Sequence, residues 1–343
     1  MVGLPRRRWL LAQFVAAICM GAVALWWVGR GLDWHLVWQT LTTVRRAWVL
    51  VSVMGVIAVA LAKTARWQAL YRVTARRPAF GTLFAGLMAA QAINLAIPIR
   101  VGELVRLGWM KQANQPAAIT LSTIVTEKII DLLSAGLMAT SLIALAVAPS
   151  WLHSQAGSTL LIGLTLVVGL VLASRLQPRL ERWLACRLGW KDWLPVHWRG
   201  RLVHAAHTML EALGALTGRR AVIPVVGWTI IVWLLSLLTI VALFAAFELH
   251  LPAIAAVLIM LAICSANLAP SPPALLGVMH LIAVVVLGQY GVAQPVAVGF
   301  GTVLNIVTVA PLLILGGWAL WSHAASVAAS LRQRSGEELR AEQ

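Results

Sequence analysis

The sequence predicts an all-α polytopic membrane protein. Of its 343 residues, 61% are hydrophobic and only 11% are charged, a composition that excludes an ordinary soluble enzyme. Several apolar segments reach the ~20 residues with which a helix crosses a bilayer. The 27 Lys and Arg residues far outnumber the 11 Asp and Glu residues. In so apolar a chain this excess indicates orientation in a membrane, and we expect no nucleic-acid partner.

Six segments are expected to cross the membrane completely. They lie at residues 9–29, 47–62, 117–148, 156–173, 221–247 and 295–321. The first follows three arginines, as in a signal peptide, but it ends in Trp26 and Trp27 rather than in small residues. We therefore interpret it as an uncleaved helix whose N-terminus lies in the cytoplasm.

Two further apolar stretches, residues 80–98 and 252–269, each run into a proline-containing interruption. The first interruption is NLAIP at 94–98 and the second is NLAPSPP at 267–273. Proline and the residue before it disfavour a continuous helix. Each stretch therefore predicts two short helices with a tip between them.

The distribution of Lys and Arg favours re-entrant hairpins at these two places. With both hairpins re-entrant, the strongly basic segment 174–220 lies in the cytoplasm, as the positive-inside rule requires. Both termini are then cytoplasmic. The prediction is one transmembrane domain over 1–330, with a first half at 47–173, a basic linker at 174–220 and a second half at 221–321. A short cytoplasmic tail at 331–343 follows.

The two hairpins also resemble each other in sequence. Asn94-Leu95-Ala96 recurs as Asn267-Leu268-Ala269, and Gln115-Pro116 before one span recurs as Gln294-Pro295 before the last. The first hairpin would enter from the cytoplasm and the second from outside, which predicts an inverted repeat. Transporters with such repeats bind their substrates near the midplane, where helices are broken.

Charged residues follow the first interruption. Arg100, Glu103 and Arg106 recur every third residue, which places them along one slowly rotating helix face. Gly102, between them, permits close approach of another backbone or of a headgroup.

The next span contains Glu127, Lys128 and Asp131. Glu127 lies about 15 Å along that helix, near the middle of the bilayer. Because a lone charge at that depth costs about 3 kcal/mol, we expect Arg100 and Arg106 to face Glu127 and Asp131. Either these arginines bind an anionic group, above all phosphate, or the charges form an internal network that locks the hairpin.

Other polar residues receive simpler interpretations. Lys63, Arg66 and Trp67 are interpreted as anchors at the end of the second span. His204 and His207 are expected on a basic surface helix rather than at a metal. The sequence contains no recognisable phosphate loop or metal-binding helix, so no metal or cofactor is expected.

At the charged residues the sequence resembles the transmembrane-region family of lysylphosphatidylglycerol synthases. The family's pattern Pro-x-Arg-x-Gly-Glu-x-x-Arg stands here as Pro98, Arg100, Gly102, Glu103 and Arg106. Its second pattern, Glu-Arg-x-x-Asp in the following span, is represented here by Glu127, Lys128 and Asp131, with lysine in place of the arginine.

The second half departs from the family's Pro-x-Pro-Gly-Gly-Leu-Gly-x-x-Glu. Here the chain reads SPPALLGVMH over 271–280, so Ala274 and Leu275 replace two glycines and His280 replaces the glutamate. A histidine there would titrate near neutral pH.

The resemblance implies movement of lipids across the bilayer, without the aminoacyl-transferase domain that some members carry. We expect a non-enzymatic, flippase-like protein of the bacterial inner membrane that moves an anionic or polyprenyl-phosphate-linked lipid between leaflets. The alternative is a non-transporting, lipid-binding accessory subunit of a glycosyltransferase or lipid-modifying enzyme; a transferase that uses Glu127 or Asp131 as a base is disfavoured. The expected headgroup site comprises Asn94, Arg100, Gly102, Glu103, Arg106, Glu127, Lys128, Asp131, Asn267 and His280.

Overall fold

A computed structural model describes most of the chain. The described residues are 18–30, 32–71, 77–97, 101–144, 219–267 and 272–341. Arg100, the predicted span at 156–173, and His204 and His207 lie outside them, as does the basic linker apart from its last two residues.

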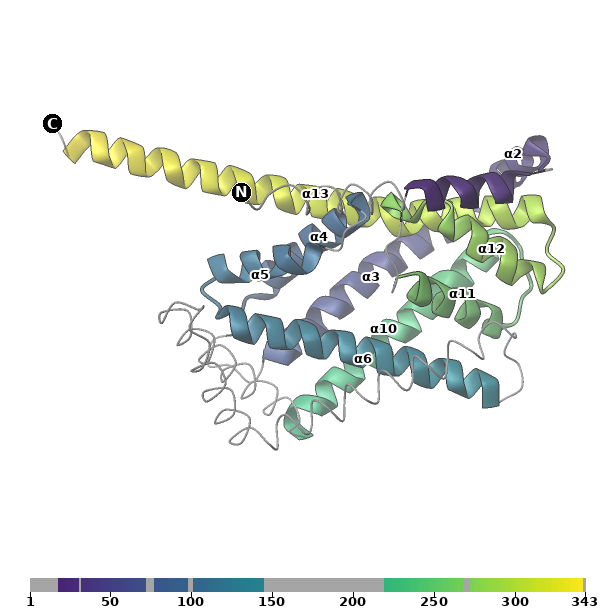
Figure 1. Ribbon diagram of the computed structural model, residues 1–343, viewed down its shortest axis with the longest axis horizontal. Coiled ribbons are helices and arrows are strands. Elements are labelled where there is room, and N and C mark those ends of the chain that lie inside the picture. Colours follow the sequence, from purple (N-terminus) through teal and green to yellow (C-terminus); the bar gives the residue numbers. More distant parts are fainter. Residues whose placement is uncertain are drawn as a thin grey trace, which may run out of the picture. The chain divides into compact units, whose positions relative to one another are not determined.

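The described part of the chain is helical and contains no β-strand (Figure 1). An apolar helix over Ile18–Gly29 comes first. It is followed by α2 (Trp34–Thr43), α3 (Arg46–Leu70), α4 (Phe80–Ala96), α5 (Gly102–Gln112), α6 (Ala117–Ala144), α10 (Arg219–Ala246), α11 (Ala253–Ala266), the short 3-10 helix η2 (Pro273–Leu275), α12 (Val278–Gly288) and α13 (Gln294–Ala341).

Three of these helices are long and apolar enough to cross a membrane. They are α3, α10 from Val222 to Ala246, and α13 from Gln294 to Ala324. The chain is thus a membrane protein, while the prediction of six complete spans stays a prediction. α6 has 28 residues, long enough to span, but it carries the three charged residues noted above. α13 continues to Ala341, so most of the predicted tail is helical.

Both predicted interruptions occur where the prolines stand. α4 ends at Ala96 and α5 begins at Gly102; α11 ends at Ala266 and α12 begins at Val278. The order of elements is therefore the same in both halves: a long helix, two short helices separated by a break, and another long helix. Re-entry into the membrane and inversion of the repeat stay predictions.

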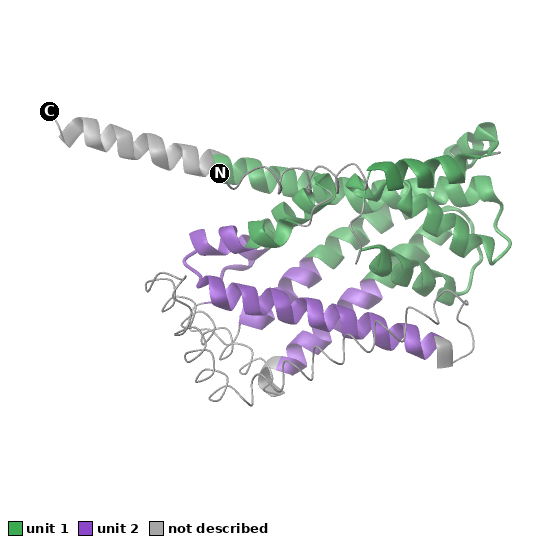
Figure 2. Cartoon of the chain, in the orientation of Figure 1, with its two compact units in different colours: residues 1–60, 84–106, 236–343 green, residues 61–83, 107–235 purple. Residues whose placement is uncertain are grey.

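The chain divides into two compact units, each assembled from separate stretches (Figure 2). Unit 1 comprises residues 1–60, 84–106 and 236–343, and unit 2 comprises residues 61–83 and 107–235. The boundary between units falls within α3, α4, α5 and α10.

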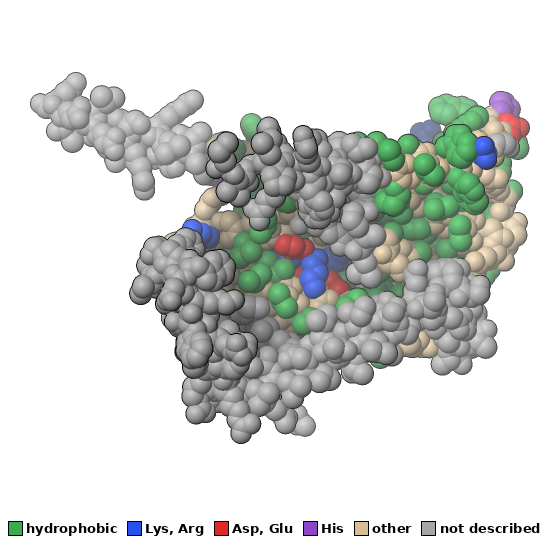
Figure 3. Space-filling view, in the orientation of Figure 1, with side chains coloured by type: hydrophobic (Ala, Val, Ile, Leu, Met, Phe, Trp, Pro, Cys, Tyr) green, Lys and Arg blue, Asp and Glu red, His purple; other side chains and the backbone are tan. Residues whose placement is uncertain are grey.

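Within unit 1, α13 is the element against which others pack. α2 and α12 both contact it, and α11 packs against α12. Gly301 permits one of these contacts, because a Cβ there would lie 2.8 Å from the Cα of His280. Figure 3 shows hydrophobic side chains covering the face formed by α2, α12 and α13. Such a surface is expected where a protein meets lipid.

Candidate functional site

The first helix break is held by Asn94. Its side-chain Oδ1 accepts a hydrogen bond of 2.8 Å from the backbone N–H of Gly102, one of the α5 donors that has no partner within its own helix. A Cβ on Gly102 would lie only 2.5 Å from the Asn94 Nδ2. The chain thus turns back after the break, and the start of α5 lies directly against the last turns of α4. Two predicted site residues, Asn94 and Gly102, are joined here across the break.

Glu103 and Arg106 form an ion pair in the first turns of α5. Arg106 Nη1 lies 3.2 Å from Glu103 Oε2; the arginine side chain is almost fully buried, whereas 28% of the glutamate side chain is exposed. A negative charge in the first turn of a helix is also favourable for the helix dipole. Arg106 therefore has a counter-charge on its own helix, next to the break.

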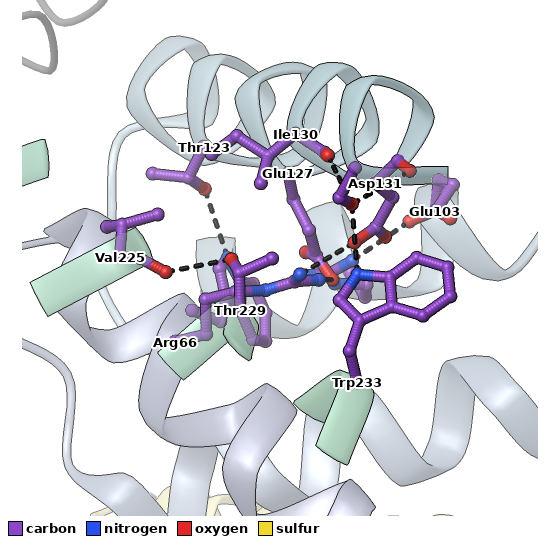
Figure 4. Close-up of polar contacts among 12 residues, drawn as sticks. Arg66, Glu103, Thr123, Glu127, Ile130, Asp131, Val225, Thr229 and Trp233 are labelled. Atoms are coloured by element: carbon purple, nitrogen blue, oxygen red, sulfur yellow. Dashed lines mark hydrogen bonds and ion pairs between the residues drawn. The ribbon is translucent and has the colours of Figure 1, made fainter. Parts of the chain in front are cut away.

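Glu127 and Asp131 pair with an arginine that we had interpreted as an interfacial anchor. Arg66 on α3 donates from Nη2 to Glu127 Oε1 at 3.2 Å and from Nη1 to Asp131 Oδ1 at 2.6 Å (Figure 4). Its side chain is completely buried, so the anchor interpretation was wrong. The predicted second span ended at residue 62, but α3 continues to Leu70 and carries Arg66 into the protein interior.

In this network the Arg66 guanidinium contacts both carboxylates. Glu127 is almost completely buried, whereas 42% of the Asp131 side chain is exposed. Full burial of three charges would be costly, and the partial exposure of Asp131 reduces that cost. The three groups form the buried ionic network that joins α3 to α6 within unit 2.

Two neutral hydrogen bonds extend the contact between α3 and α6. Trp67 Nε1 donates to Thr123 Oγ1 at 3.0 Å, and the Tyr71 hydroxyl donates to Thr120 Oγ1 at 2.8 Å. Trp67 and Tyr71 are both completely buried. The partners on α6 move toward its N-terminus as the residues on α3 move toward its C-terminus, so these two helix segments are antiparallel.

The α6 partners form one polar stripe along the helix. The stripe comprises Thr120, Thr123, Glu127, Asp131 and Ser134. Their spacing of three or four residues places them on one helix face. Ser134, the last of them, accepts a hydrogen bond of 3.0 Å from Trp233 Nε1 on α10. The stripe thus connects α6 to two other helices of unit 2.

The second helix break has an unusual backbone. Ala274 and Leu275 have φ values of +53° and +55°, and Gly277 has φ +81°, a region that glycine adopts most readily. Asn305 on α13 supports this segment, because its Nδ2 donates to the Ala274 carbonyl at 2.7 Å. His280, in the first turn of α12, is buried and its Nε2 lies 3.1 Å from Thr302 Oγ1.

The remaining predicted site residues have other surroundings. Lys128 is exposed, on a different face of α6 from Glu127 and Asp131. Asn267 is the exposed C-cap of α11, where its backbone N–H bonds to the Ile263 carbonyl. The second break is therefore supported by Asn305 rather than by Asn267, although Asn267 matches Asn94 in the sequence repeat. In the described ranges no group of three or more His, Cys, Asp or Glu residues is arranged to hold a metal ion.

Comparison with known families agrees with this architecture. The chain matches the lysylphosphatidylglycerol synthase TM region over residues 10–316. It belongs to this family. No curated protein matches the chain in sequence. The family is one of membrane proteins of lipid metabolism or transport, and the match includes both helix breaks and the polar stripe of α6.

The backbone of the second break explains a feature of the family pattern. The two positions at which the pattern has glycines are those of Ala274 and Leu275, and both have positive φ here. This chain therefore keeps a glycine-like backbone without the glycines.

Arg66 and Asn305 are the site residues that sequence analysis did not identify. A signal for Arg66 existed: the stripe on α6 is polar over more than three turns, and a buried polar stripe requires partners on a neighbouring helix. Asn305 left no comparable signal, because a single Asn in a span does not reveal which carbonyl it contacts.

Proposed function

We propose that this protein moves an anionic or polyprenyl-phosphate-linked lipid between the leaflets of the bacterial inner membrane. Membership of a lipid-related membrane family supports a lipid substrate. The observation that carries the proposal is the pair of buried Arg106 with partly exposed Glu103 at the start of α5, directly after a broken helix. Ionisable groups at membrane depth mark substrate paths more often than they mark scaffolding.

In the proposed mechanism Arg106 exchanges partners. Without lipid its guanidinium pairs with Glu103; with lipid, a phosphate takes the place of the Glu103 carboxylate. The guanidinium suits this exchange because its planar fork matches two oxygens of either a carboxylate or a phosphate. Arg100, four residues after Ala96 in the sequence, is proposed to provide a second positive charge for the same headgroup.

The network around Arg66 has a different role in the proposal. Glu127 and Asp131 already share Arg66, so we assign them to the scaffold of unit 2 rather than to the exchanging pair. Lipid moves down its own gradient or is driven by an ion gradient.

Leaflet exchange in proteoliposomes tests the function. The full chain is reconstituted with a fluorescent phosphatidylglycerol, and a membrane-impermeant quencher reports the rate at which labelled lipid changes leaflet. Arg106→Ala and Arg100→Ala should each slow exchange about tenfold or more, the equivalent of one lost charge-assisted hydrogen bond. Lys111→Ala, at the exposed end of α5, is the matched control and should leave the rate unchanged.

A normal rate in both arginine variants would overturn the proposed site. Arg106→Lys separates charge from geometry, because lysine keeps the charge but lacks the fork; an intermediate rate is expected. If the purified wild-type protein gives no exchange and instead co-purifies with a glycosyltransferase or another lipid-modifying enzyme, the accessory-subunit alternative replaces transport.

A further inference from the structure

A groove within unit 1 lies between α3 and α13, away from both helix breaks. We infer that this groove holds one acyl chain of an anionic phospholipid, with the lipid phosphate on Arg46. The groove has a volume of about 610 Å³, within the range of small-molecule sites. Its α3 wall includes Val49, Val53 and Ile57, and its α13 wall includes Val307, Ala310 and Ile314.

The spacing of these residues explains why the groove exists. Val49, Val53 and Ile57 recur every fourth residue and so form one face of α3. The facing residues Val307 and Ala310 are short, so the two helix faces leave space between them. The wall residue Ile314 is 69% exposed, so the groove is open along one side rather than closed as a core cavity.

The length and lining of the groove fit a lipid chain. From Arg46 to Ile57 the helix rises about 16 Å, which is close to half of the ~30 Å hydrocarbon core. The length of the groove is therefore close to the thickness of the hydrocarbon layer of one leaflet. Its lining is apolar apart from Arg46, which stands at the first residue of α3.

Charge identifies the headgroup. The neighbouring Arg45 is paired with Glu248 at 2.6 Å, and its backbone N–H donates to the Ala246 carbonyl at 3.0 Å. In the described structure Arg46 has no such ionic partner. A guanidinium at the mouth of an apolar groove complements a phosphate with an attached hydrocarbon chain, whereas a neutral lipid would leave it without a counter-charge.

This inference does not depend on leaflet exchange, because the groove shares no residue with the Arg106–Glu103 pair. A transport-defective protein can still bind lipid here, and the reverse also holds. The two experiments therefore fail independently.

Photolabelling of the full-length protein in vesicles tests the groove. The vesicles contain phosphatidylglycerol with a diazirine in one acyl chain, or a diacylglycerol with the same chain, and labelled peptides are located by mass spectrometry. Phosphatidylglycerol should label residues 49–57 and 303–315 more strongly than the exposed face of α10, where Ile223 and Leu238 are 70% and 60% exposed.

Neighbouring residues provide matched variants. Val53→Trp fills the groove and should lower its labelling about tenfold, whereas Met54→Trp, on the exposed adjacent face, should not. Arg46→Ala should reduce phosphatidylglycerol labelling to the diacylglycerol level, whereas Arg45→Ala should have no such effect. Ala310→Trp fills the groove from α13 and replaces Val53→Trp if that variant does not fold.

Three results would overturn the inference. One is equal labelling of the groove and of the α10 face, which would mean bulk bilayer lipid only. Another is equal labelling by phosphatidylglycerol and diacylglycerol in the wild type. The third is a covalent link between two protein copies through residues 303–315 without a lipid adduct, which would make the groove an interface between copies of the chain.

Discussion

Arg66 on α3 and Asp131 on α6 form an ion pair of 2.6 Å, in which the arginine side chain is completely buried and the carboxylate is partly exposed. The same guanidinium also contacts Glu127. Arg66 on a neighbouring helix therefore stabilises two carboxylates of α6. Because the proposed function rests on Arg106 and not on Arg66, substitutions of Arg66 test the stability of the protein separately from lipid exchange.

The first prediction concerns removal of that cation. Arg66→Met should destabilise the protein by about 3 to 5 kcal/mol, because it removes a buried guanidinium that pairs with both Glu127 and Asp131. The measurement is the free energy of unfolding in detergent. The triple variant Arg66→Met/Glu127→Gln/Asp131→Asn should recover part of the loss, since it also removes the buried negative charges.

An exposed arginine provides the control for Arg66. Arg45→Met breaks a pair whose two side chains are each 60% exposed, and such pairs contribute about 1 kcal/mol or less. Equal losses from Arg66→Met and Arg45→Met would contradict the assignment of Arg66 to a buried network.

The second prediction tests the contact at the first break. Gly102→Ala should destabilise the protein by about 1 to 3 kcal/mol, because its Cβ would collide with α4 near Asn94. Gly108→Ala on the same helix has no atom within 4 Å of the new Cβ and should be neutral or stabilising by up to ~1 kcal/mol. Thermal unfolding of the two variants, measured side by side, checks the difference. If both alanines behave alike, α5 does not approach α4 as described.

The third prediction uses two adjacent glycines of α13. A Cβ on Gly316 would lie 2.5 Å from the Ala92 Cβ of α4, whereas a Cβ on Gly317 meets nothing within 4 Å. Gly316→Ala should therefore lower the unfolding temperature, and Gly317→Ala should preserve or raise it. A reversed order of the two unfolding temperatures would exclude the packing of α4 on α13.

The fourth prediction concerns the second break. Ala274 has φ +53°, which costs a non-glycine residue about 1 kcal/mol. Ala274→Gly removes this strain but increases the entropy of the unfolded chain by an amount worth about 0.4 to 1 kcal/mol, so the protein should be equally stable or slightly more stable. Ala283→Gly, within the buried part of α12, should instead lose about 1 kcal/mol. The two variants are compared by chemical or thermal unfolding in the same detergent. A clear loss of stability in Ala274→Gly would show that the positive φ is not a strain at this position.

The sequence alone determined the helical class, the membrane setting, the family and the positions of both helix breaks. These features depend on local properties: apolar runs set the length of a spanning helix, and proline interrupts a helix wherever it stands. The charged motif after the first break was also visible, because its spacing along one helix is a local pattern. Its side-chain partners were not.

Only the tertiary structure decided which charges meet. Arg66 and Glu127 are 61 residues apart along the chain, and Asn305 is 31 residues from the Ala274 carbonyl that it supports. No local pattern specifies such pairs, because they depend on which helix faces pack together and at what depth. An arginine near the apparent end of a span is equally compatible with an exposed anchor and with a buried counter-ion; the continuation of α3 to Leu70 and its packing against the polar stripe of α6 distinguish the two.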